Sequence, residues 1–431
     1  MASRPPNILW ICTDQQRFDT IHALNNPHIR TPNLDRLAAE GTAFTHAYCQ
    51  SPICTPSRAS FLTGMYPSRV RACCNGNDTW AAAVTLVTKR LADAGYDCGL
   101  SGKLHLAAAQ DRVEKRGEDG YRVFHWSHGP IHLDQPGHAY DAWLSEHGHS
   151  LAELRQDPAG IPPKLHQTTW CADQAIDFIE AAESEPWLFS VNIFDPHAPF
   201  DPPHGYRDHY PAEAMPGPHF RESDLAAQQK LASVGFQTEA RQPDAFNAKG
   251  IQAAYWAMVE LIDTNVGRML KALERTGQAD NTLVIFTSDH GEALGDHGLL
   301  KKGCRFYEGL TRVPLLMRLP GRFPPGRRSE ALVELTDIAP TLLELAGLDV
   351  PPDMQGRSLL PMLDGKAPLG EHREYVRCEY YAALPVARHP QPNCGPRATM
   401  IRDRRHKLVV YHGTDLGELF DLAEDPWEFD N

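Results

Sequence analysis

Short apolar segments alternate with helix-like segments along most of this chain, and this alternation limits its fold more than any other feature. The apolar segments that read as buried strands are 8–12, 96–101, 187–194 and 283–287. The segments with helical periodicity and end signals are 31–41, 86–94, 171–182 and 251–276. Such alternation is typical of parallel strands joined by helical crossovers. We therefore expect an α/β fold in which helices sandwich a mostly parallel sheet.

A pair of polar side chains follows each of these four predicted strands. The pairs are Asp14 and Gln15, Lys103 and His105, Asp195 and His197, and Asp289 and His290. One such pair is ordinary loop chemistry. Four of them indicate a site, because open α/β sheets bind ligands at the carboxyl ends of their strands.

The pattern changes toward the C-terminus. Short strand-like runs at 374–380, 398–402 and 407–411 have no long helices between them, which predicts a small antiparallel sheet. We expect a catalytic domain over residues 1–370 and a C-terminal sheet subdomain over residues 371–431. Before this, the proline-rich stretch 199–247 reads as a long surface excursion that covers the cleft.

The overall charge excludes some partners. The 431 residues carry 42 Lys plus Arg against 55 Asp plus Glu, a formal net charge of −13. This argues against nucleic-acid and anionic-membrane partners, which need a basic surface. A local cluster of cations can still create a positive cleft for a small anion. No apolar run reaches the roughly 18 residues of a membrane helix, and the short run 8–12 is no secretory signal, so a cytoplasmic location is expected.

The segment 51–64 is the most informative part of the chain. It reads S-P-I-C-T-P-S-R-A-S-F-L-T-G and resembles the signature of the sulfatase family, C-x-P-S-R followed by A-S-x-L-T-G. The resemblance implies that a formylglycine-generating enzyme oxidises Cys54 to formylglycine, an aldehyde. Pro56, Ser57 and Arg58 would be the residues that this enzyme recognises.

Further motifs of the same family follow in the family's order, so the resemblance covers nearly the whole chain. They lie at 6–14, 31–38, 102–105, 195–199, 287–292, 298–314 and 419–426. The resemblance implies a formylglycine-dependent type I sulfatase with an alkaline-phosphatase-like fold. Relatives usually continue beyond the last of these motifs, which leaves open whether the natural chain extends past Asn431.

The chemistry of the reaction agrees with these residues. A sulfate ester spreads negative charge over three oxygens, and its hydrolysis adds charge to the leaving oxygen. The site therefore needs cations, an acid and a nucleophile. A hydrated aldehyde offers two hydroxyls on one carbon: one attacks sulfur, and deprotonation of the other releases sulfate and restores the aldehyde.

A divalent cation is expected beside this nucleophile. Asp14, Gln15, Asp289 and His290 form a set of hard ligands, and the resemblance implies calcium. Many family members have a second aspartate where this chain has Gln15. That departure, with His290, leaves manganese or magnesium open. The metal lowers the pKa of the attacking hydroxyl and binds a sulfate oxygen.

The resemblance also implies roles for the remaining site residues. Arg58 fixes the aldehyde hydrate. Lys103 and Lys302 contact sulfate oxygens, with the adjoining Lys301 as the alternative to Lys302. His197 is the acid for the leaving group and His105 is the base that collapses the intermediate. Asp289 is a further candidate to accept the proton of the attacking hydroxyl.

Several histidines remain outside these motifs. The spacing of His125, His128, His132 and His138 fits no standard zinc site. We interpret this stretch as a variable loop near the cleft, and contact of one of its histidines with substrate is an open alternative. His297 is a further candidate to point into the site.

The predicted function is the hydrolysis of a sulfate ester to an alcohol and inorganic sulfate. A phosphonate monoester or phosphodiester hydrolase is the nearest alternative, because the same nucleophile and metal serve tetrahedral phosphorus. A non-catalytic protein that binds sulfated ligands, and a hydrolase that uses the Cys54 thiol itself, are the others. Aryl, alkyl and carbohydrate sulfates all remain open, with a preference for carbohydrate, because specificity lies in loops such as 121–141 and 199–247. The sequence does not fix the oligomeric state.

Overall fold

The computed structural model of the chain describes residues 5–76, 84–109, 113–129, 137–182, 186–235, 237–383 and 397–431. Within these ranges no helix has both the length and the apolar character needed to cross a membrane. The predicted His132 lies outside the described residues.

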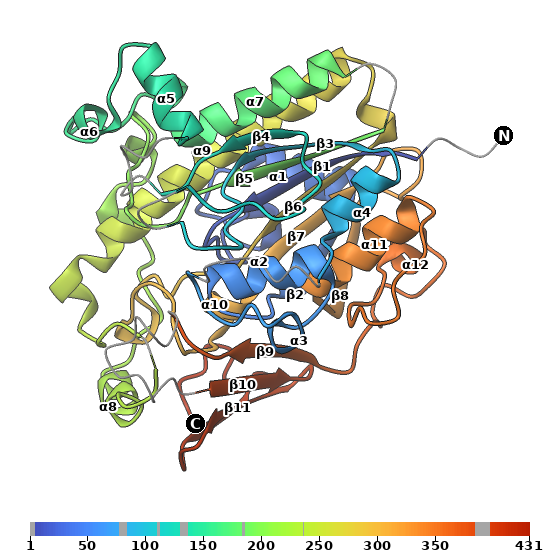
Figure 1. The fold of residues 1–431 in the computed structure, drawn as a ribbon. Coiled ribbons are helices and arrows are strands. Elements are labelled where there is room, and N and C mark those ends of the chain that lie inside the picture. The colour runs from blue at the N-terminus through green and yellow to red at the C-terminus, as the bar shows by residue number, and fades with distance from the viewer. Residues whose placement is uncertain are drawn as a thin grey trace.

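A twisted sheet runs through the centre of the molecule (Figure 1). In the described residues it has eight strands, in the order β4-β3-β5-β1-β6-β7-β2-β8. Their bounds are β1 (Asn7–Thr13), β2 (Thr42–Tyr48), β3 (Asp97–Gly102), β4 (Val123–Trp126), β5 (Trp187–Ile193), β6 (Thr282–Ser288), β7 (Arg312–Arg318) and β8 (Arg327–Glu334). Only β7 pairs antiparallel with its described neighbours, β6 and β2. The predicted α/β fold with a mostly parallel sheet is confirmed.

Helices cover both faces of this sheet (Figure 1). The α-helices are α1 (Pro32–Glu40), α2 (Cys54–Thr63), α3 (Pro67–Val70), α4 (Val87–Asp93), α5 (Ala139–Glu146), α6 (Leu151–Leu154), α7 (Gln167–Ala181), α8 (Ser223–Lys230), α9 (Ala248–Arg275), α10 (Glu308–Thr311), α11 (Ile338–Leu345) and α12 (Leu360–Leu363). Most of the predicted stretch 199–247 is irregular, with α8 and short 3₁₀ turns.

The central strand β1 shows why the chain needs two helical layers. Leu9 and Ile11 pack in one core with residues of α1, α7 and α9. Ile8, Trp10 and Cys12 pack in the other core with residues of α2, α4 and α11. Successive side chains of a strand point to opposite faces, so a strand that is apolar throughout must be covered on both sides.

A second, smaller sheet lies at the C-terminal end of the chain (Figure 1). Its antiparallel strands are β9 (Val376–Tyr380), β10 (Arg397–Arg402), β11 (His406–His412) and β12 (Gly417–Asp421). The sequence predicted the first three of these strands. The division of the chain at residue 371 stays a prediction.

Candidate active site

The polar pairs of the sequence lie at one edge of the main sheet. The strands β3, β5, β1 and β6 are neighbours and run parallel. The side chains that follow their carboxyl ends therefore converge. Lys103, after β3, donates to Asp14, after β1. The backbone N–H of Gln15 donates to Asp289 Oδ1, after β6, over 3.0 Å.

Two glycines allow the backbone to approach closely at this edge. A Cβ on Gly102, which has φ of +98°, would lie 1.9 Å from the carbonyl oxygen of Asn192. A Cβ on Gly291 would lie 1.9 Å from the carbonyl oxygen of Gly309. Neither position has room for a side chain. The glycines beside Lys103 and His290 are therefore part of how these side chains are positioned.

Cys54 is the first residue of α2, and its buried thiol points into the convergence. Its Sγ lies 3.2 Å from His290 Nε2 and 3.6 Å from Asp14 Oδ1. Burial, the largest influence, raises the pKa of the thiol, and the Asp14 carboxylate adds to this. The positive charges of Lys103, Lys302 and His290 outweigh both, so the pKa lies below its usual value. The lowered pKa favours the thiolate form, which is the nucleophilic form of cysteine.

Four side chains around Cys54 form a compact donor set. One ligand atom from each of Asp14, Cys54, Asp289 and His290 lies within 4.8 Å of the others, and all four residues are buried. Carboxylate oxygens with an imidazole nitrogen suit a hard divalent cation. Burial raises the pKa of Asp14, but Lys103 and other nearby charges hold it well below its usual range. The carboxylate is therefore charged and ready to bind a metal.

Gln15 lies beside this donor set with its amide fixed at both ends. Its Nε2 donates to Glu292 Oε2, and its Oε1 accepts from Lys302 Nζ over 2.5 Å. A carboxylate accepts only and an ammonium donates only, so the two partners set the orientation of the amide. The fully buried Glu292 also accepts from the backbone N–H groups of Leu294 and Lys301. It thus connects Gln15 to the loop that carries Lys302.

Two further cations hold the acids in place. Arg58 Nε donates to Asp289 Oδ2 over 2.8 Å, and its Nη1 donates to the carbonyl oxygen of Lys103 over 2.7 Å. Burial lowers the pKa of Lys103, but the Asp14 carboxylate outweighs it and the net shift is upward. Lys103 and Arg58 therefore keep their positive charges in the interior.

The two predicted acid–base histidines flank the cavity over Cys54. His197 Nδ1 donates to the carbonyl oxygen of Ala198 over 2.5 Å, and the ring packs against Phe194. His105 packs edge-on against His128, with ring centroids 4.8 Å apart. Burial and the neighbouring charges of Lys302 or Lys103 place the pKa of both histidines well below the usual value. Both are neutral at neutral pH.

A cavity of about 560 Å³ opens over Cys54. Lys301, Lys302, His105, His197 and Gln15 are among the residues on its wall. The other lining residues are Cys54, Asn75, Gly76, Lys103, Ala109, His128, Gly129, Arg155, Phe194, Ala198, Pro199 and Ala383. The volume lies within the roughly 300–1,000 Å³ typical of small-molecule sites. No Asp or Glu of the described ranges lines this cavity.

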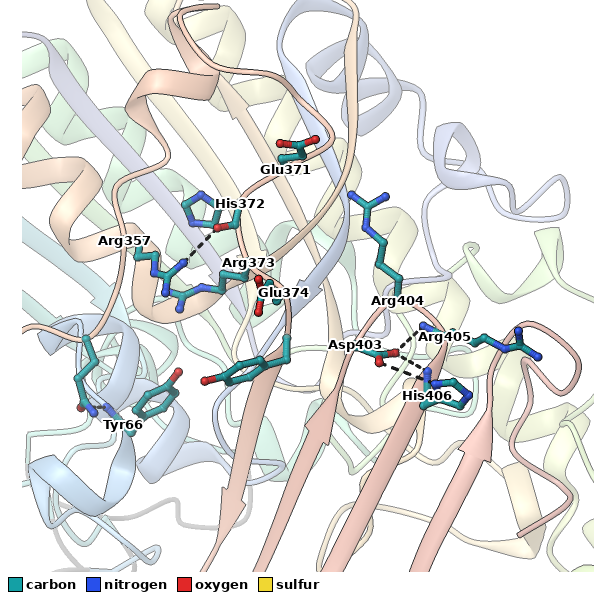
Figure 2. A pocket seen from close by; sticks show the side chains of 12 residues that line it. Tyr66, Arg357, Glu371, His372, Arg373, Glu374, Asp403, Arg404, Arg405 and His406 are labelled. Atoms are coloured by element: carbon teal, nitrogen blue, oxygen red, sulfur yellow. Dashed lines mark hydrogen bonds and ion pairs between the residues drawn. The ribbon is translucent and has the colours of Figure 1, made fainter.

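A larger cavity of about 1080 Å³ lies where the C-terminal sheet meets the main body (Figure 2). Acidic and basic side chains alternate along it, among them Glu371, Arg373, Glu374, Asp403 and Arg404. None of its lining residues lines the cavity over Cys54. The chemistry points to the smaller cavity, because that one contains the thiol and the donor set.

The structure brings together all ten residues that the sequence proposed as catalytic or metal-binding. They are Asp14, Gln15, Cys54, Arg58, Lys103, His105, His197, Asp289, His290 and Lys302. Of the other histidines, His128 lines the cavity, whereas His138 caps α5. His297 stacks on Tyr307, with ring centroids 3.9 Å apart, and is not on the cavity wall. Sequence analysis assigned no role to Glu292 or Arg155.

Similarity to known proteins extends over nearly the whole chain. The Sulfatase family matches residues 6–348, and the family described as N-sulphoglucosamine sulphohydrolase, C-terminal, matches residues 295–431. An arylsulfatase of Clostridium perfringens is 31% identical over 99% of this chain and 90% of its own length. An N-acetylglucosamine-6-O-sulfatase of Bacteroides thetaiotaomicron is 28% identical over 100% of this chain and 83% of its own. The crystal structure of a phosphonate monoester hydrolase of Agrobacterium radiobacter superposes with a TM-score of 0.82 at 29% identity, covering 99% and 91% of the two chains.

Proposed function

The chain belongs to the sulfatase family of the alkaline phosphatase superfamily, and from this premise we propose that it hydrolyses a sulfate ester through formylglycine at position 54 and one bound divalent cation. The products are an alcohol and inorganic sulfate. The observation that carries the proposal is the placement of Cys54 Sγ, 3.2 Å from His290 Nε2 and 3.6 Å from Asp14 Oδ1. A small apolar side chain would fill this buried position at less cost in stability than an ionisable thiol among metal-type donors. The thiol is therefore better explained by a function than by packing.

The cation would be held by Asp14, Gln15, Asp289 and His290, with calcium as the first candidate and manganese or magnesium as alternatives. When bound, it supplies positive charge to a sulfate oxygen and lowers the pKa of the attacking hydroxyl. Formylglycine, as its hydrate, supplies one hydroxyl for attack on sulfur and a second whose deprotonation releases sulfate. A formylglycine-generating enzyme would be the partner during maturation.

The side chains of the cavity perform the remaining steps. Arg58 donates to Asp289 and thereby fixes the donor set beside residue 54, where the aldehyde hydrate would form. Lys103 and Lys302 provide the positive charge that the sulfate oxygens need. Lys301 lies on the same wall but is exposed, which favours Lys302 for the contact beside Gln15.

The two histidines divide the proton transfers. Burial and the Lys103 charge keep His105 neutral, the form that a base requires to take the proton of the second hydroxyl. His197 is also neutral before substrate binds. The negative charge of a bound sulfate ester raises its pKa, which prepares it to donate a proton to the leaving oxygen.

Release of free sulfate from a panel of esters tests the proposal. Purified protein is incubated with aryl, alkyl and carbohydrate sulfates, and sulfate is measured by ion chromatography. We expect sulfate release that a chelator abolishes and a divalent metal restores. Binding of sulfated ligands without any release of sulfate would contradict the proposal and favour a non-catalytic protein. Activity that iodoacetamide destroys would favour a thiol hydrolase.

A phosphonate monoester or phosphodiester hydrolase is the second candidate. It is favoured by Gln15, which stands beside the donor set where many sulfatases have an aspartate, by His290 within the set, and by the superposition with a phosphonate monoester hydrolase. The ratio of kcat/KM for phenyl sulfate and a phenyl phosphonate ester separates the two functions. A carbohydrate sulfate is our preferred substrate class, since one of the relatives above is a sulfatase of an amino sugar.

A further inference from the structure

The cavity over Cys54 has the opposite charge to the rest of the chain. Its lining includes four side chains with permanent positive charge, Lys103, Arg155, Lys301 and Lys302, and no carboxylate of the described residues. The chain as a whole has a formal net charge of −13. A positive cavity in an acidic protein concentrates anions at one place on its surface. The cations are not all beside the reacting sulfate, so some of them can contact other parts of a bound substrate.

Two of these cations belong to the reacting end of the cavity. Lys103 donates to Asp14, and Lys302 donates to Gln15 Oε1 over 2.5 Å. Both acceptors are candidate metal ligands beside Cys54. Arg155 has no contact with any of the candidate metal ligands. It therefore offers its charge to a different part of a bound molecule.

Arg155 directly follows α6, and a single contact with the side chain of Asp201 holds its guanidinium. Its Nε donates to Asp201 Oδ2 over 2.7 Å, and about 31% of its side chain is exposed. Asp201 is itself fixed, since its backbone N–H donates to the carbonyl oxygen of Pro199 and its carbonyl oxygen contacts His166 Nε2. In the described part of the chain, Nη1 and Nη2 of Arg155 have no hydrogen-bond partner. The guanidinium is oriented and keeps donors for a ligand.

Arg155 differs from an arginine that satisfies its carboxylate with two parallel bonds. Arg122 contacts Asp97 through both Nε and Nη2, each over 2.6 Å, which satisfies the carboxylate with two parallel bonds. Arg155 gives Asp201 one bond only. Within the described residues Arg155 therefore keeps both terminal nitrogens available, whereas Arg122 uses one of its own for Asp97.

We propose that Arg155 is a specificity-determining residue that binds a second anionic group, a carboxylate or a second sulfate, on the alcohol part of the substrate. This inference rests on the proposed sulfatase function and names its substrate class as an anionic, sulfated saccharide. A guanidinium with free donors matches the planar oxygens of a carboxylate or two oxygens of a sulfate. A cationic alkyl sulfate is disfavoured, since the described lining of the cavity has cations and no carboxylate.

The position of Arg155 also indicates where the second group lies. Arg155 lines both the cavity over Cys54 and an adjoining hollow of about 190 Å³, whose wall also carries Arg207 and the carboxylates of Asp157 and Asp201. The second anionic group would therefore lie beside Arg155 within the cavity over Cys54, whose described lining has no carboxylate, and not in the adjoining hollow. Phe194, Ala198 and Pro199 on the wall between provide apolar contact for a sugar ring.

Paired substrates that differ by one charge test this inference. The first pair is a sulfated 4-nitrophenyl glucuronide and its methyl ester, in which the carboxylate is neutral. The second pair is a 4-nitrophenyl N-acetylglucosaminide with one or two sulfates. Each is prepared with the reacting sulfate at every free ring position, and kcat/KM is measured from free sulfate. We expect the wild type to prefer the more anionic member of at least one pair by roughly 10- to 100-fold, and the pair identifies the second group.

Variants then assign this preference to the arginine. Arg155→Gln is expected to remove the preference, and Arg155→Lys to retain part of it because the charge remains. Arg122→Gln is the matched control, since it also breaks an Arg–Asp pair but lines no part of the cavity; it should leave the preference unchanged. No preference in the wild type, or an equal preference in Arg155→Gln, would overturn the inference while the sulfatase function stands. Absence of sulfate release from every ester would overturn the sulfatase function and this inference with it.

Discussion

Two buried clusters of charge in this molecule are built in different ways. The junction cluster, Glu308, Arg402, Lys407 and Glu428, links the C-terminal sheet to the main body. Here Lys407 Nζ lies between two acids, 2.9 Å from Glu308 Oε1 and 2.6 Å from Glu428 Oε1. Each charge meets an opposite charge of the same chain, so the cluster is complete.

The site cluster, Asp14, Cys54, Asp289 and His290, is arranged around a shared centre instead. Four ligand atoms face one another within 4.8 Å, and the cations Arg58 and Lys103 contact the outer oxygens of the acids. Such an arrangement suits a divalent cation at the centre. Burial of charge therefore does not by itself indicate a functional site. The two clusters differ in the direction in which their donor atoms point, and this direction distinguishes a metal site from a structural ion-pair cluster.

Substitution in the site cluster should affect activity far more than stability. Cys54→Ala removes the residue that becomes the nucleophile and should lower sulfate release by roughly 10⁶-fold, as nucleophile removal does in other hydrolases. Its urea unfolding curve should stay close to that of the wild type. Substantial activity in Cys54→Ala would show that the site cluster is not the catalytic centre.

Substitution in the junction cluster should change the stability of the fold and not the catalytic activity. Lys407→Met leaves two buried carboxylates without their shared cation and should lower the free energy of unfolding by about 3–5 kcal/mol. Urea denaturation measures this change. The control is Lys366→Met, since Lys366 forms an ion pair with Asp364 but is 75% exposed, so its effect should be below about 1 kcal/mol. Equal effects of the two variants would contradict the account of the junction cluster.

Glu292 offers a finer test of the site cluster. Glu292→Gln removes the carboxylate that sets the orientation of the Gln15 amide, and should weaken divalent-metal affinity by about 10- to 100-fold. Isothermal titration of chelator-treated protein with calcium and with manganese measures the affinity independently of activity. Gln278→Glu, which replaces a side chain next to the opposite end of β1, serves as the control. Unchanged affinity in Glu292→Gln would remove this residue from the metal site.

The smallest effect concerns pH and lies next to the junction cluster. Burial, with the charges of Arg312 and Arg402, lowers the pKa of His46 to about 3. The unfolded chain therefore takes up a proton on His46 below about pH 6.5 while the folded chain does not, so this term destabilises the fold as pH falls. His46→Gln should regain about 1–2 kcal/mol of unfolding free energy at pH 5 relative to pH 8, measured against the wild type. An unchanged pH dependence would show that His46 protonates equally in both states.

The sequence was sufficient to predict the elements whose signals are local. Helix 31–41 was expected from an early proline and a terminal glycine, and α1 spans Pro32–Glu40 with Gly41 at its end. The strand β2, with the sequence TAFTHAY, was missed because its apolar residues come in adjacent pairs and do not alternate with polar ones, and because it follows α1 after one residue. β7 was missed as well; it contains Pro314 and pairs antiparallel within a parallel sheet. Tertiary packing decides such strands.

The candidate site follows the same rule. The residues after the four strand ends could be predicted to meet, because topology brings parallel strand ends together. Glu292 could have been suspected, since it is an acid in a buried segment two residues after His290. Arg155 could not, because it reaches the cavity through its contact with Asp201, which is 46 residues away in the sequence. Such long-range contacts have no signature in a single sequence.

We propose that position 54 holds an aldehyde beside the donor atoms of Asp14 and His290. Mass spectrometry of the peptide that contains residue 54, from protein coexpressed with a formylglycine-generating enzyme, tests it most directly. The account predicts the mass of formylglycine at this residue, in proportion to the sulfate that the preparation releases. A fully active preparation that carries an unmodified Cys54 thiol in every molecule would contradict it.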